Sequence, residues 1–246
     1  MPTLKYFQVK NQTEDSVDLY FYGDICSSTC DEWEYEDKCP QEIKDALEAA
    51  AGRSINIYIN SGGGSAFAGI AIYNMIRRYA ETVQVSVTVD GIAGSIASVI
   101  ALSGNSPLKI PGNAFLVIHN PYGMIEGDAG ELRRSADMLD EVKTSMVGIY
   151  MEHAKEGVTE DQIRAMMDAE TWLSGMEAAQ YFDVETTEDV QAAAATGDYL
   201  KRAKHIPKGF KAEPAKNRYP DPDAQEAKRI TNKRAQIKRT IIHALG

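Results

Sequence analysis

The sequence predicts an α/β protein, because strands and helices alternate along the chain. Residues 55–59 form a β-branched run that predicts a strand, and a glycine-rich turn follows it. Apolar residues from Ile70 to Tyr79 then recur at helical spacing. A strand at 83–89 and an apolar small-residue helix at 92–102 repeat the pattern. Two successive βα units predict a sheet covered by helices.

Further strands and helices are predicted on either side of these two units. The strands are expected at 17–22, 108–111 and 114–118, and the helices at 40–51, 130–156, from Thr159 onward, and at 175–181. Pro40 suits a helix start, because proline lacks the N–H that the first turn leaves without a partner. Glu160 and Asp161 suit the positive N-terminal end of the helix that starts at Thr159.

The long helix at 130–156 has an apolar stripe formed by Leu132, Met138, Leu139, Val142, Met146, Val147 and Tyr150. A stripe of this width can bury against a partner subunit, and packing within the chain would explain it equally well. Oligomerisation through this helix is therefore one expectation.

Charge is unevenly distributed along the 246 residues, whose formal net charge is -10. Residues 201–246 carry 13 Lys/Arg and four Asp/Glu, whereas residues 1–200 carry 13 Lys/Arg and 32 Asp/Glu. We therefore predict a globular domain over 1–200 and a basic tail over 201–246, with a proline-rich linker and a terminal helix at 224–244. The tail is either solvated or docked on an acidic surface, and without interleaved aromatic residues no nucleic-acid role is expected.

Several classes of protein are not expected from the composition. The longest weakly polar run, 91–104, is too short to span a bilayer, and the start of the chain lacks a signal-peptide pattern. We expect a cytoplasmic protein. Reduced thiols are therefore favoured for Cys26, Cys30 and Cys39, whose spacing matches no standard zinc site. No metal or cofactor is expected.

A serine stands where a predicted strand meets an apolar helix, in the run Gly91-Ile92-Ala93-Gly94-Ser95. Small residues allow a sharp turn there, and the hydroxyl would lie at a helix N-terminus that favours a developing anion. The run differs from the G-x-S-x-G elbow, because Ala97 replaces the second glycine. Ser95 is a candidate nucleophile, and the motif alone also fits a helix cap.

Three consecutive glycines follow the strand at 55–59, in the run Asn60-Ser61-Gly62-Gly63-Gly64-Ser65. Main-chain N–H groups of such a turn can hold an oxyanion or a phosphate. No Gly-Lys-Ser/Thr follows, and Phe67 replaces the last glycine of G-x-G-x-x-G, so a nucleotide site is not expected. A tight turn without function is the alternative to an oxyanion hole.

His119 follows the apolar strand at 114–118, where it is well placed to accept the proton of a serine. A structural histidine at the core edge is the alternative. A base of this kind is oriented by an acid. The acid candidates are Asp168 and Glu170, and either can also be an ordinary charge at a helix end or in a loop.

Together these motifs resemble the Clp peptidase proteolytic subunits, and among them the bacteriophage head-maturation (prohead) proteases related to Clp. The resemblance covers roughly residues 15–190. Its carriers, in the family order, are residues 58–65, 71–73, 91–95, 118–121, 172–174, 177–178 and Tyr181. The resemblance implies a crotonase-type stack of βα units that assembles into a homo-oligomeric ring, with the helix at 130–156 interlocking two rings.

The resemblance implies a serine endopeptidase (a hydrolase) with Ser95 as nucleophile and His119 as general base. It also implies that the backbone N–H groups of Gly64 and Ile96 form the oxyanion hole. The family's triad aspartate stands two residues before the aromatic of the last motif, where this sequence has Glu170. Glu170 is therefore the expected third member, and Asp168 is the alternative.

The resemblance also suggests partners. Phage relatives act on capsid or scaffold proteins, which implies a polypeptide substrate of that kind in the bacterial host cytosol. The N-terminal segment does not resemble the region that housekeeping subunits present to their ATPase, so an ATPase partner is not expected. Gly62 replaces the family's proline, which loosens the turn and keeps its N–H donors.

Two other functions remain open. One is a Ser-Lys dyad peptidase of the same fold, for which Lys109 is the nearest lysine in sequence. The other is a catalytically inactive crotonase-fold module for assembly, which Glu170 at the acid position favours. An acyl-CoA crotonase would use the same paired N–H donors, and the presence of Ser95 and His119 in motif argues against it.

Overall fold

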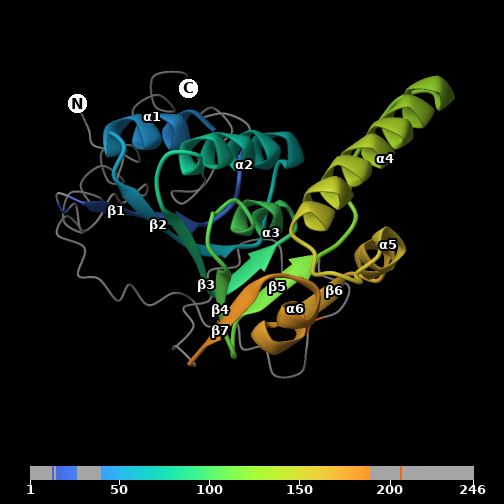
Figure 1. Cartoon of the computed structure of the whole chain (residues 1–246). Helices are drawn as coiled ribbons and strands as arrows, with labels where there is room; N and C mark the ends of the chain where they lie inside the picture. The colour runs from blue at the N-terminus through green and yellow to red at the C-terminus, as the bar shows by residue number, and fades with distance from the viewer. Residues whose placement is uncertain (1–12, 14, 27–39, 189–205, 207–246) are drawn as a thin grey trace, which may run out of the picture. The chain divides into compact units, whose positions relative to one another are not determined.

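The computed structural model describes residues 13, 15–26, 40–188 and 206, and it has the predicted α/β architecture (Figure 1). The strands are β1 (Ser16–Tyr22), β2 (Ser54–Ser61), β3 (Val85–Gly94), β4 (Leu108–Pro111), β5 (Phe115–Ile118), β6 (Thr171–Ser174) and β7 (Val184–Thr187). The helices are α1 (Pro40–Ala50), α2 (Ala66–Ala80), α3 (Ile96–Ala101), α4 (Ala129–Glu152), α5 (Glu160–Asp168) and α6 (Gly175–Tyr181). The predicted basic tail, its helix at 224–244, Cys30 and Cys39 lie outside these residues, apart from Ile206.

The seven described strands belong to one sheet. Its main order is β1-β2-β3-β4-β7, and β5 pairs with both β3 and β6. The pairs β1–β2, β2–β3 and β3–β5 are parallel, whereas β5–β6 is antiparallel. Parallel strands place their carboxyl ends at the same edge of a sheet, where α/β proteins bind their ligands. The turns that follow β2, β3 and β5 therefore meet at one edge.

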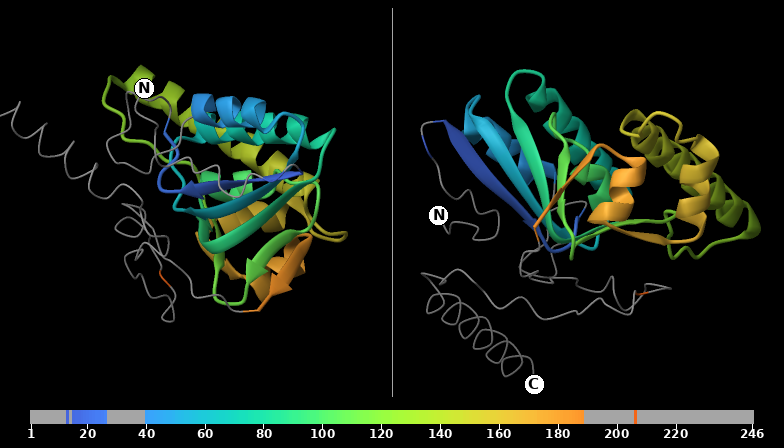
Figure 2. Two further views of the ribbon diagram at one scale, coloured as in Figure 1. Left: turned by 90° about the vertical axis from the view of Figure 1, so that its left-hand side faces the viewer. Right: turned by 60° about the horizontal axis from the view of Figure 1, so that its bottom comes forward.

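The core lies between the sheet and the helices that cover it. Val17, Leu19 and Phe21 of β1 are fully buried, in the alternation expected for one face of a strand. Figures 1 and 2 show α1 and α2 side by side over the face of β1, β2 and β3. Every residue of α3 is buried. Close packing of this kind fixes the strand ends that carry the site.

The region after β3 differs from the sequence prediction. The strand continues through Gly94, so residues 92–94, which were expected in a helix, pair instead with residues 115–117 of β5. The helix that follows is correspondingly short and begins at Ile96. The change is caused by strand pairing, because Ile92 and Val117 pack together with Trp172 in a separate apolar cluster.

The long helix also ends earlier than expected. α4 stops at Glu152, and His153 is its C-cap rather than a residue within the helix. Lys155 N donates to the carbonyl of Tyr181 rather than to a carbonyl of α4, so the helix does not continue through this residue. The strands β6 and β7 were not predicted from the sequence.

Much of α4 lacks contacts with the rest of the described chain. Its buried residues, Val142, Met146, Val147 and Tyr150, all lie in its second half. From the predicted stripe, Leu132 and Met138 are 45% and 44% exposed. Figure 1 shows the first half of α4 extending away from the sheet. None of the helices in the described part of the chain has the length and hydropathy needed to cross a membrane.

Candidate active site

Ser95 occupies the sharp turn between β3 and α3. Its backbone has φ 54° and ψ -129°, in a region that residues other than glycine rarely adopt. Backbone strain of this kind occurs at functional sites, and it is typical of nucleophile turns. The side chain makes no capping hydrogen bond to α3, so the alternative of a simple helix cap is not what the structure shows. Ser95 N donates to the carbonyl of Val117 at 2.9 Å, which joins the turn to β5.

A buried hydroxyl pair supports this turn from within the core. Ser98 Oγ donates to the carbonyl of Ser95, and it lies 2.7 Å from the hydroxyl of Tyr150. A hydroxyl has one proton, so the Tyr150 hydroxyl donates to Ser98 Oγ. Burial raises the pKa of Tyr150, which keeps it a donor at neutral pH. The second half of α4 is thereby connected to the Ser95 turn.

The glycine turn after β2 lies directly against Ser95. A Cβ added to Gly63 would lie 2.6 Å from Ser95 Cβ and 3.2 Å from Ile96 N. Gly63 and Gly64 have φ 104° and 144°, which other residues rarely adopt. Ile25 holds the turn, since its N–H donates to Gly63 O at 2.8 Å and its carbonyl accepts from Ser65 N at 2.7 Å.

These contacts bring together the two turns that carry Gly64 and Ile96, the predicted oxyanion-hole donors. Ile96 is the first residue of α3, where a main-chain N–H has no acceptor within the helix. A helix N-terminus also favours negative charge. The arrangement is therefore suited to an oxyanion beside Ser95.

His119 directly follows β5, which is the neighbour of β3. Gly94 and Val117 are partners in this parallel pair, so Ser95 and His119 leave adjacent strands at the same edge. The imidazole is 8% exposed. Its Nδ1 lies 2.6 Å from the carbonyl of Asn120, and its ring centroid lies 5.9 Å from that of Tyr122.

Glu170 directly precedes β6, which pairs with β5. Ile118 and Thr171 are partners in the antiparallel pair, so His119 and Glu170 are the residues that directly adjoin the same end of this pair. Glu170 is 9% exposed and has φ 52°. A buried carboxyl in a rarely adopted backbone conformation is characteristic of a functional position.

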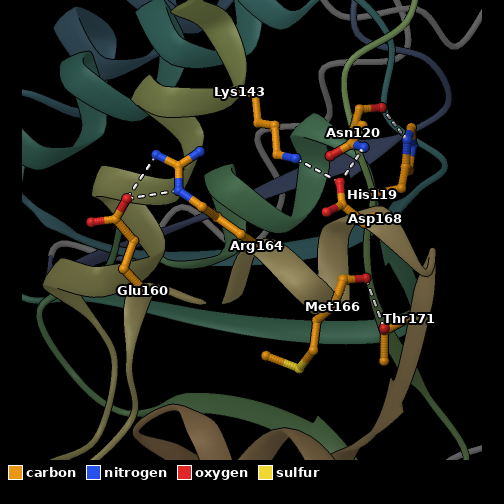
Figure 3. A network of polar contacts seen from close by, with 8 residues as sticks. All are labelled: His119, Asn120, Lys143, Glu160, Arg164, Met166, Asp168 and Thr171. Atoms are coloured by element: carbon orange, nitrogen blue, oxygen red, sulfur yellow. Dashed lines mark hydrogen bonds and ion pairs between the residues drawn. The ribbon is translucent and has the colours of Figure 1, made fainter. Parts of the chain in front are cut away.

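Asp168 lies at the end of α5 and is exposed. It accepts hydrogen bonds from Lys143 Nζ at 2.6 Å and from Asn120 Nδ2 at 2.8 Å (Figure 3). The hydrogen bonds from Lys143 and Asn120 hold the pKa of Asp168 below its ordinary value. These hydrogen bonds therefore connect Asp168 to Asn120, the residue next to His119, rather than to the imidazole itself.

Lys109, the candidate for a Ser-Lys dyad, lies elsewhere in the sheet. It is in β4, opposite Thr88 of β3. Thr88 precedes Ser95 by seven residues, which along a strand corresponds to about 20 Å. A lysine side chain cannot cover that separation, so the structure does not bring Lys109 to Ser95.

Sequence reasoning did not find Asn120 or Lys143 as residues of this region. Asn120 falls within the motif at 118–121, but the motif predicts no role for its side chain. Lys143 lies in a long helix, 25 residues from Asp168, and nothing local in the sequence marks the pair.

Comparison with known proteins shows which family the chain is similar to. A family model described as Clp protease matches residues 34–184, more than half of the chain. The ATP-dependent Clp protease proteolytic subunit of Bacteroides fragilis is 32% identical over 132 residues, which are 53% of this chain and 61% of that protein. The subunit of Porphyromonas gingivalis is 32% identical over 135 residues, 54% of this chain and 59% of that protein.

A third relative is proteolytic subunit 1 of Leifsonia xyli, 34% identical over 131 residues, 52% of this chain and 64% of that protein. The chain thus spans less than two thirds of the length of the curated relatives it matches. The family match includes the glycine turn, Ser95, His119 and Glu170. On this match, the chain belongs to the Clp protease family.

Proposed function

We propose that this protein is a serine endopeptidase in which Ser95 is the nucleophile and His119 the general base. The observation that carries the proposal is the backbone of Ser95. It is held at φ 54° without a capping role, on the strand next to the one that ends at His119. A serine that only terminated a strand would not require this conformation.

The chemistry follows from the residues that meet at the sheet edge. Ser95 Oγ attacks the peptide carbonyl while His119 Nε2 takes its proton, and the imidazolium then protonates the leaving amine. The N–H groups of Gly64 and Ile96 hold the oxyanion of the tetrahedral intermediate. Water, deprotonated by His119, hydrolyses the acyl-enzyme and regenerates Ser95.

Glu170 is the residue we assign as the acid of the triad. It is buried, and it directly precedes β6, whose first residue, Thr171, pairs with Ile118, the residue before His119. Because His119 Nδ1 contacts the Asn120 carbonyl, the Glu170 carboxylate acts through its charge, which stabilises the imidazolium that forms when Ser95 loses its proton. Asp168 is exposed and bound to Lys143 and Asn120, which makes it the weaker alternative for direct contact with the imidazole.

Polypeptides are the substrate class, and a homo-oligomeric ring is the proposed assembly. Leu132 and Met138 on the first half of α4 are exposed in the single chain, and the proposed assembly would cover them. The resemblance to phage head-maturation proteases further suggests capsid or scaffold proteins as substrates in a bacterial host cytosol.

Labelling with a fluorophosphonate probe tests the proposal on the full chain. We expect a single adduct on Ser95, located by mass spectrometry, that is absent from Ser95→Ala and strongly reduced in His119→Gln. Ser145→Ala removes a hydroxyl that donates to the carbonyl of Glu141 within α4, and this variant should label like the wild type.

Two outcomes would support other functions. Undiminished labelling of His119→Gln would indicate a base other than His119, as in a Ser-Lys dyad. An unlabelled but folded and assembled wild type would overturn the peptidase assignment and favour the inactive assembly module, for which Glu170 at the acid position is the supporting observation.

A further inference from the structure

We propose that Lys143 and Asp168 are positioning residues for His119, and that they act through Asn120. This inference rests on the proposed function, because it assigns a role at the same site. Neither residue has to touch the imidazole or the substrate. Their role is to hold the residue whose carbonyl binds the imidazole (Figure 3).

Asn120 is the connecting residue, because it contacts both Asp168 and His119. Its side-chain Nδ2 donates to Asp168 Oδ1 at 2.8 Å, and its main-chain carbonyl lies 2.6 Å from His119 Nδ1. The side-chain bond limits rotation of Asn120, so it also fixes where the carbonyl of the same residue points. The position of Asp168 is thereby transmitted to the imidazole.

The contact with the carbonyl selects one form of His119. A carbonyl oxygen can only accept, so Nδ1 must carry the proton. In the neutral imidazole Nε2 then has the lone pair, which is the form that can take a proton from Ser95. The Asn120 carbonyl thus keeps His119 in the tautomer that a general base requires.

Lys143 holds Asp168 from the second half of α4. The Nζ–Oδ1 distance is 2.6 Å, and the Lys143 side chain is only 17% exposed. The nearby pair Arg164–Glu160 has a similar distance, 2.7 Å, but it joins two residues one turn apart on α5. Lys143–Asp168 instead joins two helices, α4 and the last residue of α5.

The Arg164–Glu160 pair provides a matched control, since Figure 3 shows it close to the network but without a contact to Asn120. We would measure the second-order rate of fluorophosphonate labelling for Asn120→Ala, Asp168→Ala, the double variant and Glu160→Gln. Asn120→Ala retains the main-chain carbonyl and removes only the link to Asp168.

Both single variants should label more slowly by on the order of tenfold, less than the roughly hundredfold cost of a full ångström of misplacement. The double variant should be no slower than either single one, because both substitutions break the same link. Lys143→Arg should retain most of the rate, and Glu160→Gln all of it. Equal rates in the wild type, Asn120→Ala and Asp168→Ala would overturn the inference.

A second readout does not depend on a reactive serine. In protein labelled with ¹⁵N-histidine there are four histidines, and His119 is identified by the signals lost in His119→Gln. The Nδ1–H tautomer should dominate in the wild type and in Glu160→Gln, and should lose population in Asn120→Ala and Asp168→Ala. An unchanged tautomer ratio in these two variants would contradict the positioning role.

The two measurements separate the inference from the function on which it rests. A wild type that fails to label would refute the peptidase assignment, and the tautomer ratios would still decide the role of Asp168 and Asn120. A wild type that labels normally, with variants that label equally well, would refute the positioning role alone.

Discussion

Gly63 and Ser95 lie so close that any side chain on Gly63 would collide with the nucleophile turn. An added Cβ would lie 2.6 Å from Ser95 Cβ and 2.7 Å from Gly94 O, and the second of these is a main-chain atom that cannot rotate away. The contact connects the end of β2 to the end of β3. It therefore determines where the proposed nucleophile and oxyanion-hole donors lie relative to one another.

Gly63→Ala should reduce labelling of Ser95 by at least tenfold and destabilise the protein. The backbone φ of 104° costs an alanine about 1–2 kcal/mol, and displacement of the Ser95 turn adds to it. Gly52→Ala is the control, because Gly52 has φ 79° with nothing within 4 Å of its added Cβ. This control should lose stability without losing labelling, as measured by urea denaturation and probe kinetics. Equal labelling of both variants would show that the Gly63–Ser95 contact does not matter for reactivity.

Tyr150→Phe should weaken the support of the Ser95 turn from the core. It removes the hydroxyl that donates to Ser98 Oγ, at a cost of about 1 kcal/mol in the free energy of unfolding. Labelling of Ser95 should fall several-fold, because Ser98 also bonds the Ser95 carbonyl. Tyr79→Phe removes a comparable bond, to the carbonyl of Arg53 at 2.9 Å, far from Ser95 in the chain. It should lose similar stability and label normally, and a labelling defect in Tyr79→Phe would contradict this account.

Local patterns in the sequence were sufficient to predict most of the fold. The β-branched run at 55–59 and the three glycines after it predicted a strand and a turn, and the structure has β2 and the Gly63 turn at these positions. β6 and β7 were missed because neither has a run of apolar residues like that of β5: β6 has two apolar residues between Thr171 and Ser174, and β7 has only Val184. The end of β3 was missed because small apolar residues at 92–94 fit a buried strand and a buried helix equally well.

The residues of the candidate site could also be predicted only in part. Ser95 and His119 stand in recognisable motifs, but a serine before a helix looks like a cap, and only the backbone shows otherwise. The Asn120–Asp168 contact spans 48 residues and depends on the packing that brings the end of α5 to the segment after β5. Contacts of that range leave no local pattern in a single sequence.

Protonation of His153 should lower the free energy of unfolding in mildly acidic solution. Burial lowers its pKa from the ordinary 6.5, and the nearby charge of Arg77 acts in the same direction. Its Nε2 lies 2.9 Å from the hydroxyl of Tyr73, at the C-terminal end of α4. Because the folded state binds the proton less readily than the unfolded chain, stability should decrease as pH falls below about 6.5, and the loss continues down to the lowered pKa.

The urea midpoint at pH 7.5 and pH 5.5 measures this effect. The wild type should lose more stability between these values than His153→Gln, which cannot take up a proton. Asp168 does not titrate in this interval, because its pKa is already held below its ordinary value. The same pH dependence in His153→Gln and wild type would assign the acid sensitivity to other groups.

The conformation of Ser95 predicts that the proposed nucleophile costs the protein stability. Ser95→Gly should be more stable than Ser95→Ala by about 1 kcal/mol, because glycine adopts φ 54°, ψ -129° with less strain. Both variants lack the hydroxyl and should fail to label, so the comparison isolates the backbone. At an ordinary exposed position the same pair would show the opposite order, since glycine loses more entropy on folding. Greater stability of Ser95→Ala in urea denaturation would mean that the turn is not strained. Greater stability of Ser95→Gly would instead show that the fold holds the proposed nucleophile in a strained backbone conformation.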